Sequence, residues 1–228
     1  MTALHEDSRV RAGMERQLAE RRRMIADGAR PIGWKLGLGT PAAMEKHGTS
    51  APLVGFLTDR GLREDGSEVD IGAWSKPTAE PELAVHIAHD VPAGADRDAA
   101  AAAIGGLGVA IELVDLGGGE VEEILAGDIF HRHVVLGGAT AGVEPADLRA
   151  VIAHGADTQE VDDPLALVGD PAAAVAHLAT HLSAFGETLR AGDVLITGSI
   201  VPALSVAPGD TLAYRLAPLG ELTLTFAE

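Results

Sequence analysis

Three glutamates are the side chains of this 228-residue chain whose types and spacing best suggest chemistry. Glu80 and Glu82 occur in TAEPELAVHIAHD, residues 78–90, which has the alternating pattern of a β-strand. Strand side chains alternate between two faces, so both glutamates lie on one face and the apolar residues between them on the other. Glu112 follows within LGVAIELVDL, which is apolar enough for a strand buried on both faces.

Buried carboxylates need positive charge nearby to offset their loss of hydration. Lysine occurs only at Lys35, Lys46 and Lys76, so one divalent cation is a simpler partner for three glutamates than several side chains. A set of oxygen ligands favours Mg²⁺ or Mn²⁺ over zinc. Glu-x-Glu is also common in proteins, and exposed or salt-bridged glutamates remain the alternative.

Composition excludes several functional classes. The formal net charge of −17 argues against nucleic acid or an anionic membrane as a partner. The absence of cysteine excludes disulfides, zinc–thiolate sites and a thiol nucleophile. The first residues, MTALHEDSRVRAG, lack the apolar core of a signal peptide, and no later run is long enough to span a membrane. We therefore expect a cytoplasmic protein.

The elements that must position these residues follow from hydrophobic spacing and from Gly and Pro breaks. Helices are expected over 7–27, in a short segment opened by Thr40 and Pro41, over 96–106 with closing glycines, over 121–125 and over 171–189. Strands are expected over 32–38, 52–57, 78–87, 107–116 and 131–138, in a hairpin at 154–157, and repeatedly over 192–226. This pattern predicts an α+β fold with a mixed, mostly-β roll. A small helical N-terminal part, 1–70, would pack on the main domain, 71–228.

The segment GLGTPA, residues 37–42, matches the glycine pattern of dinucleotide-binding turns. Asp59 follows Gly39 by 20 residues, the spacing at which such turns have an acidic residue that binds the ribose. That reading needs a helix long enough to return the chain to a parallel strand. Gly48 ends the helix after about two turns. A strand leading into a short capped helix is therefore favoured over a nucleotide site.

Six short segments occur in an order that is more specific than any one of them: GWKLGLGT at 33–40, VGFLTD at 54–59, AEPELAVHI at 79–87, AIELVD at 110–115, VVLGG at 134–138 and LRAGDVLITGSIVPALSVAPGD at 189–210. Together they resemble the fumarylacetoacetate hydrolase superfamily, within it the branch of 2-hydroxypenta-2,4-dienoate (vinylpyruvate) hydratases and 4-oxalocrotonate decarboxylases. The resemblance implies a mixed β-roll with helices, assembled as a homo-oligomer.

The resemblance also implies roles for residues. The three glutamates, Glu80, Glu82 and Glu112, would bind Mg²⁺, and Lys35 and Asp59 would be catalytic. An ion pair with a glutamate is the alternative for Lys35, and a turn before Gly61 is the alternative for Asp59. The segment Thr197, Gly198 and Ser199 would hold the substrate carboxylate through hydroxyl and backbone N–H groups, or it forms a simple turn.

These residue types suit chemistry on a 2-oxo acid. One metal ion can bind the carboxylate and the 2-oxygen and stabilise an enolate. Lys35 would polarise the 2-oxygen or donate a proton, and Asp59 would position water. The favoured reaction is hydration of 2-hydroxypenta-2,4-dienoate. Decarboxylation of a 4-oxalocrotonate-type acid, or hydrolysis or decarboxylation of an acylpyruvate or oxaloacetate-like acid, is the alternative. A third possibility is a non-catalytic subunit that partners a hydratase or decarboxylase.

The chain departs from that branch at DLGGG, residues 115–119, and at HRH, residues 131–133. His131 and His133 would share a strand face, where His131 could replace a missing hydroxyl as acid or base. The alternative is a pair of partly exposed polar histidines. His47 is a candidate for a mobile lid, and His86 is either a support for the metal ligands or a packed histidine.

Overall fold

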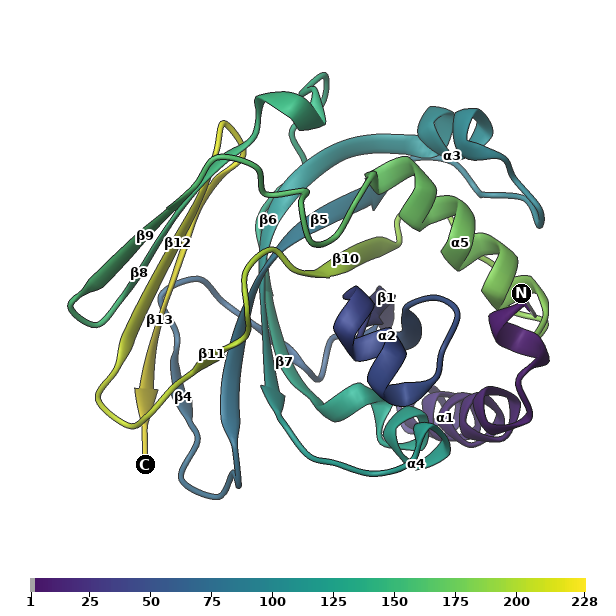
Figure 1. The fold of residues 1–228 in the computed structure, drawn as a ribbon, viewed down its shortest axis with the longest axis horizontal. Coiled ribbons are helices and arrows are strands. Elements are labelled where there is room, and N and C mark those ends of the chain that lie inside the picture. The colour runs from purple at the N-terminus through teal and green to yellow at the C-terminus, as the bar shows by residue number, and fades with distance from the viewer. Residues whose placement is uncertain (1–2) are drawn as a thin grey trace.

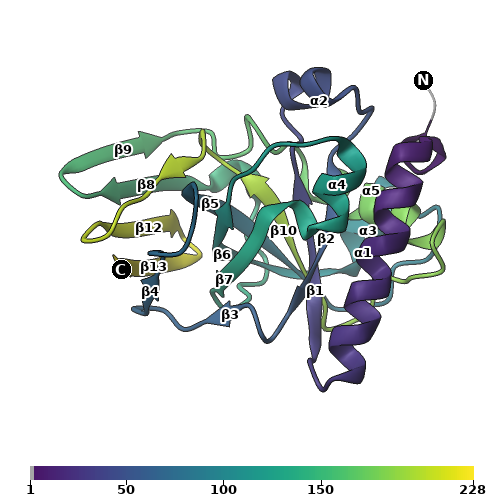
Figure 2. The ribbon, with the colours of Figure 1, turned by 90° about the horizontal axis from the view of Figure 1, so that it is seen from below.

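The computed structural model describes residues 3–228, whose strands form two sheets (Figures 1 and 2). The larger sheet is eight-stranded, with the order β2-β1-β10-β5-β6-β7-β3 and with β11 paired to β5. The smaller sheet is five-stranded, with the order β4-β13-β12-β8-β9. Figure 1 shows β5 and β6 as long curved strands that run from the smaller sheet towards α3 and α5.

The strands of the larger sheet are β1 Pro31–Gly37, β2 Leu53–Thr58, β3 Leu62–Arg63, β5 Pro77–Ile87, β6 Ile104–Asp115, β7 His131–Leu136, β10 Val194–Ser199 and β11 Leu204–Ser205. Those of the smaller sheet are β4 Glu68–Asp70, β8 Arg149–His154, β9 Asp157–Val161, β12 Thr211–Ala217 and β13 Gly220–Ala227. The α-helices are α1 Ser8–Ala26, α2 Pro41–His47, α3 Arg97–Ala103, α4 Val121–Ala126 and α5 Pro171–Ser183. Three short 3₁₀ turns are η1 Leu4–Glu6, η2 Asp128–Phe130 and η3 Pro145–Asp147.

The expected α+β fold with a mostly-β roll is confirmed, and helix ends follow local chemistry. Asp7 caps α1 by accepting a hydrogen bond from Arg9 N, and Thr40 caps α2 in the same way. Gly48 ends α2 at φ 62°, a left-handed conformation that glycine adopts without strain. The short α2 leads into β2, which is antiparallel to β1, so the dinucleotide reading is correctly rejected.

Two helix boundaries were predicted incorrectly. The helix expected over 171–189 ends at Ser183, because Gly186 at φ 74° turns the chain away. The helix expected over 96–106 ends at Ala103, and the glycines expected to close it, Gly105 and Gly106, lie within β6. There Gly106 passes close to the backbone of Thr140, where a Cβ would not fit.

The N-terminal residues are part of both sheets. Strands β1, β2 and β3 belong to the larger sheet, and β4 pairs with β13 in the smaller one. One cluster of buried apolar side chains extends from Leu4 to Phe226. The expected division of the chain into an N-terminal part, 1–70, and a main domain, 71–228, stays a prediction about which parts fold separately. No helix among residues 3–228 is long and apolar enough to cross a membrane.

Candidate functional site

The pairing of β5 with β6 brings the three glutamates together. The two strands are antiparallel, and Glu80 lies opposite Glu112 while Glu82 lies opposite Ala110. Carboxylate oxygens of all three glutamates lie within 4.8 Å of one another, the only such cluster of potential metal ligands among the described residues. The cluster agrees with the expectation that alternation places Glu80 and Glu82 on one face of their strand.

This cluster carries more negative charge than its surroundings neutralise. Glu82 and Glu112 are buried, with 0% and 1% of their surface exposed, whereas Glu80 is partly exposed. Burial, and then the neighbouring Glu112, raise the pKa of Glu80 to about 7. The pKa of Glu82 is raised well above its usual range, first by burial and then by Glu112 and Glu80.

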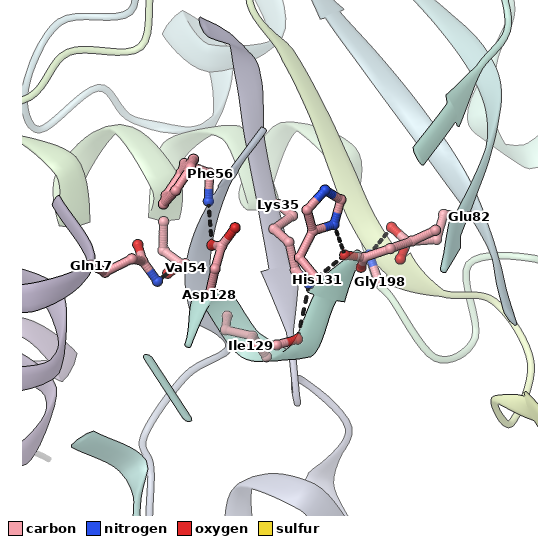
Figure 3. Close-up of polar contacts among 10 residues, drawn as sticks. Gln17, Lys35, Val54, Phe56, Glu82, Asp128, Ile129, His131 and Gly198 are labelled. Carbon is pink, nitrogen blue, oxygen red and sulfur yellow. Dashed lines mark hydrogen bonds and ion pairs between the residues drawn. The ribbon is translucent and has the colours of Figure 1, made fainter. Parts of the chain in front are cut away.

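Lys35 on β1 supplies the nearest positive charge. Its Nζ forms an ion pair with Oε1 of Glu112 and donates a hydrogen bond to the carbonyl of Ile129 at 3.2 Å (Figure 3). Burial alone would lower the pKa of Lys35, but the charges of Glu112 and Asp128 raise it overall. The ion pair that the sequence left as an alternative is therefore present, and it holds the ammonium beside the carboxylate cluster.

His131, at the start of β7, contacts the same carboxylate as Lys35. Its Nδ1 lies 2.6 Å from Oε1 of Glu112, whereas its Nε2 is buried and has no hydrogen-bond partner among the described residues. Burial alone would raise the pKa of Glu112, but the contacts with Lys35 and His131 keep it below its usual value. His131 therefore lies beside the carboxylate cluster, and its expected role as an acid or base stays a prediction.

Asp128 is a partly buried acid near Lys35 that sequence reasoning missed. It begins η2, where Asp128, Ile129 and Phe130 have φ values of 53°, 51° and 66°, unusual for residues other than glycine. Its Oδ1 accepts a hydrogen bond from Phe56 N at 2.9 Å, and burial raises its pKa to about 6. No sequence signal announces three successive left-handed residues that are not glycine.

A cavity of about 630 Å³ adjoins the cluster and is lined by Glu80 together with Thr197, Gly198 and Ser199. Gly198, at φ 97°, donates its backbone N–H to Oε2 of Glu82 at 2.7 Å. Further lining residues come from β1 and the connection after it, from helices α2 and α5, and from the connections that precede α5 and follow β10. The predicted substrate-binding segment therefore lies between the carboxylates and the cavity.

Two other candidates are not part of this group. Asp59 accepts hydrogen bonds from the backbone and guanidinium of Arg30, at 2.9 and 2.8 Å, and does not line the cavity. The expected role of Asp59 in positioning water has no support from these contacts. His47, at the end of α2, does not line the cavity either, although α2 itself does.

His133 does not share the carboxylate that His131 contacts. The pairing of β6 with β7 shifts register between Leu113 and Val114, beside these histidines. The His133 ring lies 5.8 Å from the Trp74 ring, and burial lowers the pKa of His133 to about 4. His86 packs against Gly108, as one of its two expected roles requires.

Comparison with known proteins identifies relatives that match most of the chain. The family model for the fumarylacetoacetate (FAA) hydrolase C-terminal region matches residues 16–227. The chain is 31% identical to a 4-oxalocrotonate decarboxylase of Pseudomonas putida over 214 residues, 90% of this chain and 81% of the relative. It is also 31% identical to a 2-hydroxyhexa-2,4-dienoate hydratase of Comamonas testosteroni over 219 residues, 89% of this chain and 81% of the relative.

Among solved structures, the fold is similar to that of 4-oxalocrotonate decarboxylase from Pseudomonas putida G7 in complex with magnesium and adipate. The TM-score is 0.88 at 28% identity, and the match covers 99% of this chain and 90% of that chain. The same decarboxylase is also known in complex with calcium and acetate. Relatives that share this fold thus bear names for two reactions, hydration and decarboxylation.

Proposed function

The chain belongs to the fumarylacetoacetate hydrolase C-terminal family, and from that premise we propose that it is a Mg²⁺-dependent lyase of small 2-oxo or 2-hydroxydienoic acids. The reaction that we favour is the hydration of 2-hydroxypenta-2,4-dienoate to a 4-hydroxy-2-oxo acid. Curated relatives at 31% identity support this class of reaction by their names, which specify a hydratase and a decarboxylase.

The observation that carries the proposal is the excess of carboxylate oxygens beside the cavity. Oε1 of Glu82 and Oε2 of Glu112 are buried and have no hydrogen-bond partner within residues 3–228. Such oxygens, clustered with Glu80 and matched by a single lysine, fit the ligand preference of Mg²⁺ or Mn²⁺. When bound, the cation would act as a Lewis acid that polarises the 2-oxo acid end of the substrate.

The chain's own residues have distinct tasks in this proposal. The Lys35 ammonium, held by Glu112 and the Ile129 carbonyl, stabilises negative charge on the substrate 2-oxygen and can donate a proton. His131, whose Nδ1 lies 2.6 Å from the Glu112 carboxylate, would move the proton that is transferred when water adds at carbon 4. Thr197, Gly198 and Ser199 orient the substrate carboxylate at the cavity wall.

Decarboxylation of a 4-oxalocrotonate-type acid is the second candidate, because the solved decarboxylase matches this fold with a TM-score of 0.88. Loss of CO₂ and addition of water both pass through charge on the same 2-oxygen. The position of Lys35 therefore suits either reaction.

The test is an ultraviolet assay with 2-hydroxypenta-2,4-dienoate, with Mg²⁺, with Mn²⁺ and with a chelator, followed by mass analysis of the product. We expect metal-dependent loss of the dienoate absorbance and a product heavier by one water. A parallel assay with 4-oxalocrotonate that released CO₂ faster than the dienoate is hydrated would establish the decarboxylase instead. Absence of turnover with both acids in the metal-loaded protein would favour a non-catalytic partner subunit.

Two further expectations from the sequence belong to the same proposal. We propose that the protein is a homo-oligomer and that it acts in the cytoplasm. Light scattering on the purified chain would measure the first, and cell fractionation the second.

A further inference from the structure

The wall of the cavity has a polar part and an apolar part. Beside Glu80 and the segment 197–199 the wall is polar, as a site for the 2-oxo acid end requires. Elsewhere most lining side chains are small or apolar, among them Ala43, Leu167, Val168, Ala174, Val201 and Ala203. None of the described lining residues is lysine or arginine.

Two other features could hold a second carboxylate, and both are already engaged. His177 of α5 lines the cavity, but its Nε2 lies 3.1 Å from the Pro52 carbonyl, and burial lowers its pKa, which favours the neutral ring. The N-terminus of α5 also reaches the cavity, but Asp170 caps it by accepting the N–H of Ala172 at 3.1 Å.

Asp170 would also repel a second carboxylate. This residue lines the cavity itself, and its Oδ2 lies 2.5 Å from Nε of Arg97, which does not line the cavity. The nearest guanidinium is therefore already paired with a carboxylate of the chain. A carboxylate at the far end of a substrate would lose hydration here without gaining a partner.

We propose that the cavity selects 2-hydroxydienoic acids that carry one carboxylate and an uncharged, apolar tail over dicarboxylic acids of the same length. The inference rests on the proposed function, because Glu80, Glu82 and Glu112 must first fix the 2-oxo acid end. A volume of about 630 Å³ lies within the range of about 300–1,000 Å³ that suits drug-sized ligands. Tails longer than that of a five-carbon acid therefore fit, and each buried methylene raises kcat/KM about fourfold.

The selection also bears on the reaction. In a 4-oxalocrotonate-type acid the distal carboxylate leaves as CO₂, so a cavity that disfavours this group disfavours decarboxylation. Hydration needs no distal carboxylate, because water supplies the hydroxyl group at carbon 4 and the proton that adds to the diene.

The experiment compares two six-carbon substrates that differ only at carbon 6. With saturating Mg²⁺, we expect kcat/KM for 2-hydroxyhexa-2,4-dienoate, which ends in a methyl group, to exceed that for 2-hydroxyhexa-2,4-dienedioate at least tenfold. Equal values, or a preference for the diacid, would overturn the inference even though the proposed lyase activity would stand.

A pair of variants then tests whether wall charge causes the preference. Ala203→Lys adds an ammonium group at an exposed position that lines the cavity. We expect it to reduce the preference in kcat/KM for the monocarboxylic over the dicarboxylic acid at least fivefold. Ala207→Lys adds the same charge at an exposed position that does not line the cavity. It should leave the ratio of kcat/KM for the monocarboxylic acid to kcat/KM for the dicarboxylic acid unchanged. An equal effect of both variants would assign the change to net charge and would contradict the inference.

If neither substrate turns over, the proposed function fails, but calorimetry still decides the inference. Binding of 2-oxohexanoate and 2-oxohexanedioate to the Mg²⁺-loaded protein measures the same preference without chemistry. Tighter binding of 2-oxohexanoate, by about tenfold or more, would support the inference. Tighter or equal binding of the diacid would overturn it.

Discussion

Glu82 shows most directly that stability and function conflict at this site. One of its oxygens accepts the N–H of Gly198, and the other is buried without a partner. Its pKa is raised well above the usual range by burial and by the charges of Glu112 and Glu80. The cation that we propose the three carboxylates share would explain why a side chain is placed so unfavourably for the metal-free chain.

Replacing that carboxylate tests this explanation. In Glu82→Gln the amide oxygen can still accept the N–H of Gly198, while the repulsive charge is removed. We expect Mg²⁺ affinity and turnover to fall at least 100-fold, from the loss of a charged ligand, with a Tm equal to or above that of the wild type. Titration calorimetry and thermal melts measure both quantities. Glu160→Gln on exposed β9 is the control, and wild-type turnover of Glu82→Gln under chelation would contradict the scheme.

Metal affinity should also depend on pH through Glu80, whose pKa is about 7 in the metal-free protein. Below that pH the carboxyl holds a proton that the cation must displace, so affinity should rise as the pH is raised from below to above about 7. Calorimetry in buffers of different ionisation enthalpy counts the released protons. We expect metal binding near pH 6 to release at least one proton from the wild type, and one proton fewer from Glu80→Gln. An affinity independent of pH from 5.5 to 8.5 would contradict this assignment.

At the scale of elements, tight packing of helices against each other and against the large sheet supports the site. Helix α4 precedes η2, which carries Asp128 and the carbonyl that holds Lys35, and α4 packs on α1. Gln17 of α1 donates hydrogen bonds to the carbonyls of Val54 and Leu125, at 3.2 and 2.8 Å, and so joins α1 to β2 and α4. The left-handed turn at η2 depends on these supports, since each such residue costs about 1–3 kcal/mol.

Gly13 in α1 provides a test of this packing. A Cβ there would lie 2.7 Å from Cβ of Leu125 and 2.8 Å from the carbonyl oxygen of Glu122. Glycine to alanine normally stabilises a helix by about 1 kcal/mol, but here the two helices must move apart. We expect Gly13→Ala to reduce the free energy of unfolding by about 1–3 kcal/mol in urea denaturation. The exposed Glu15→Ala should show no such loss, and a stabilised Gly13→Ala would refute the packing argument.

At the scale of the whole molecule, the two sheets share one core. The larger of two clusters of buried apolar side chains extends from Leu4 to Phe226, and β1 pairs with β10, which follows it by more than half of the chain. Removal of the N-terminal 70 residues would expose the β10 edge and take β4 from the smaller sheet. The N-terminal part and the remainder should therefore unfold together.

The two tryptophans, Trp34 and Trp74, lie on either side of residue 70 and can report on each part separately. In the single-tryptophan variants Trp74→Phe and Trp34→Phe, we expect the fluorescence midpoint in urea to coincide with the circular dichroism midpoint of the same variant. Different midpoints within one variant would indicate that residues 1–70 form a separate folding unit.

Local sequence determined much of the framework of the site. Alternation placed Glu80 and Glu82 on one strand face, because side-chain direction in a strand depends only on position along it. The apolar run around Glu112 predicted a buried carboxylate for the same local reason. Caps at Thr40 and Gly48 bounded α2, since capping depends on residues within one turn.

Only the tertiary structure decided which of these residues meet. Segments far apart in the chain are joined by the register that sets Glu80 opposite Glu112 and by the approach of Lys35 and His131 to that carboxylate. The hydrogen bond from Phe56 N to Asp128 joins two more such segments. The same holds for Asp59, which the fold pairs with Arg30 at the surface instead of bringing it to the cluster. Strand register and packing depend on the balance of contacts over the whole chain, which no local pattern of residues contains.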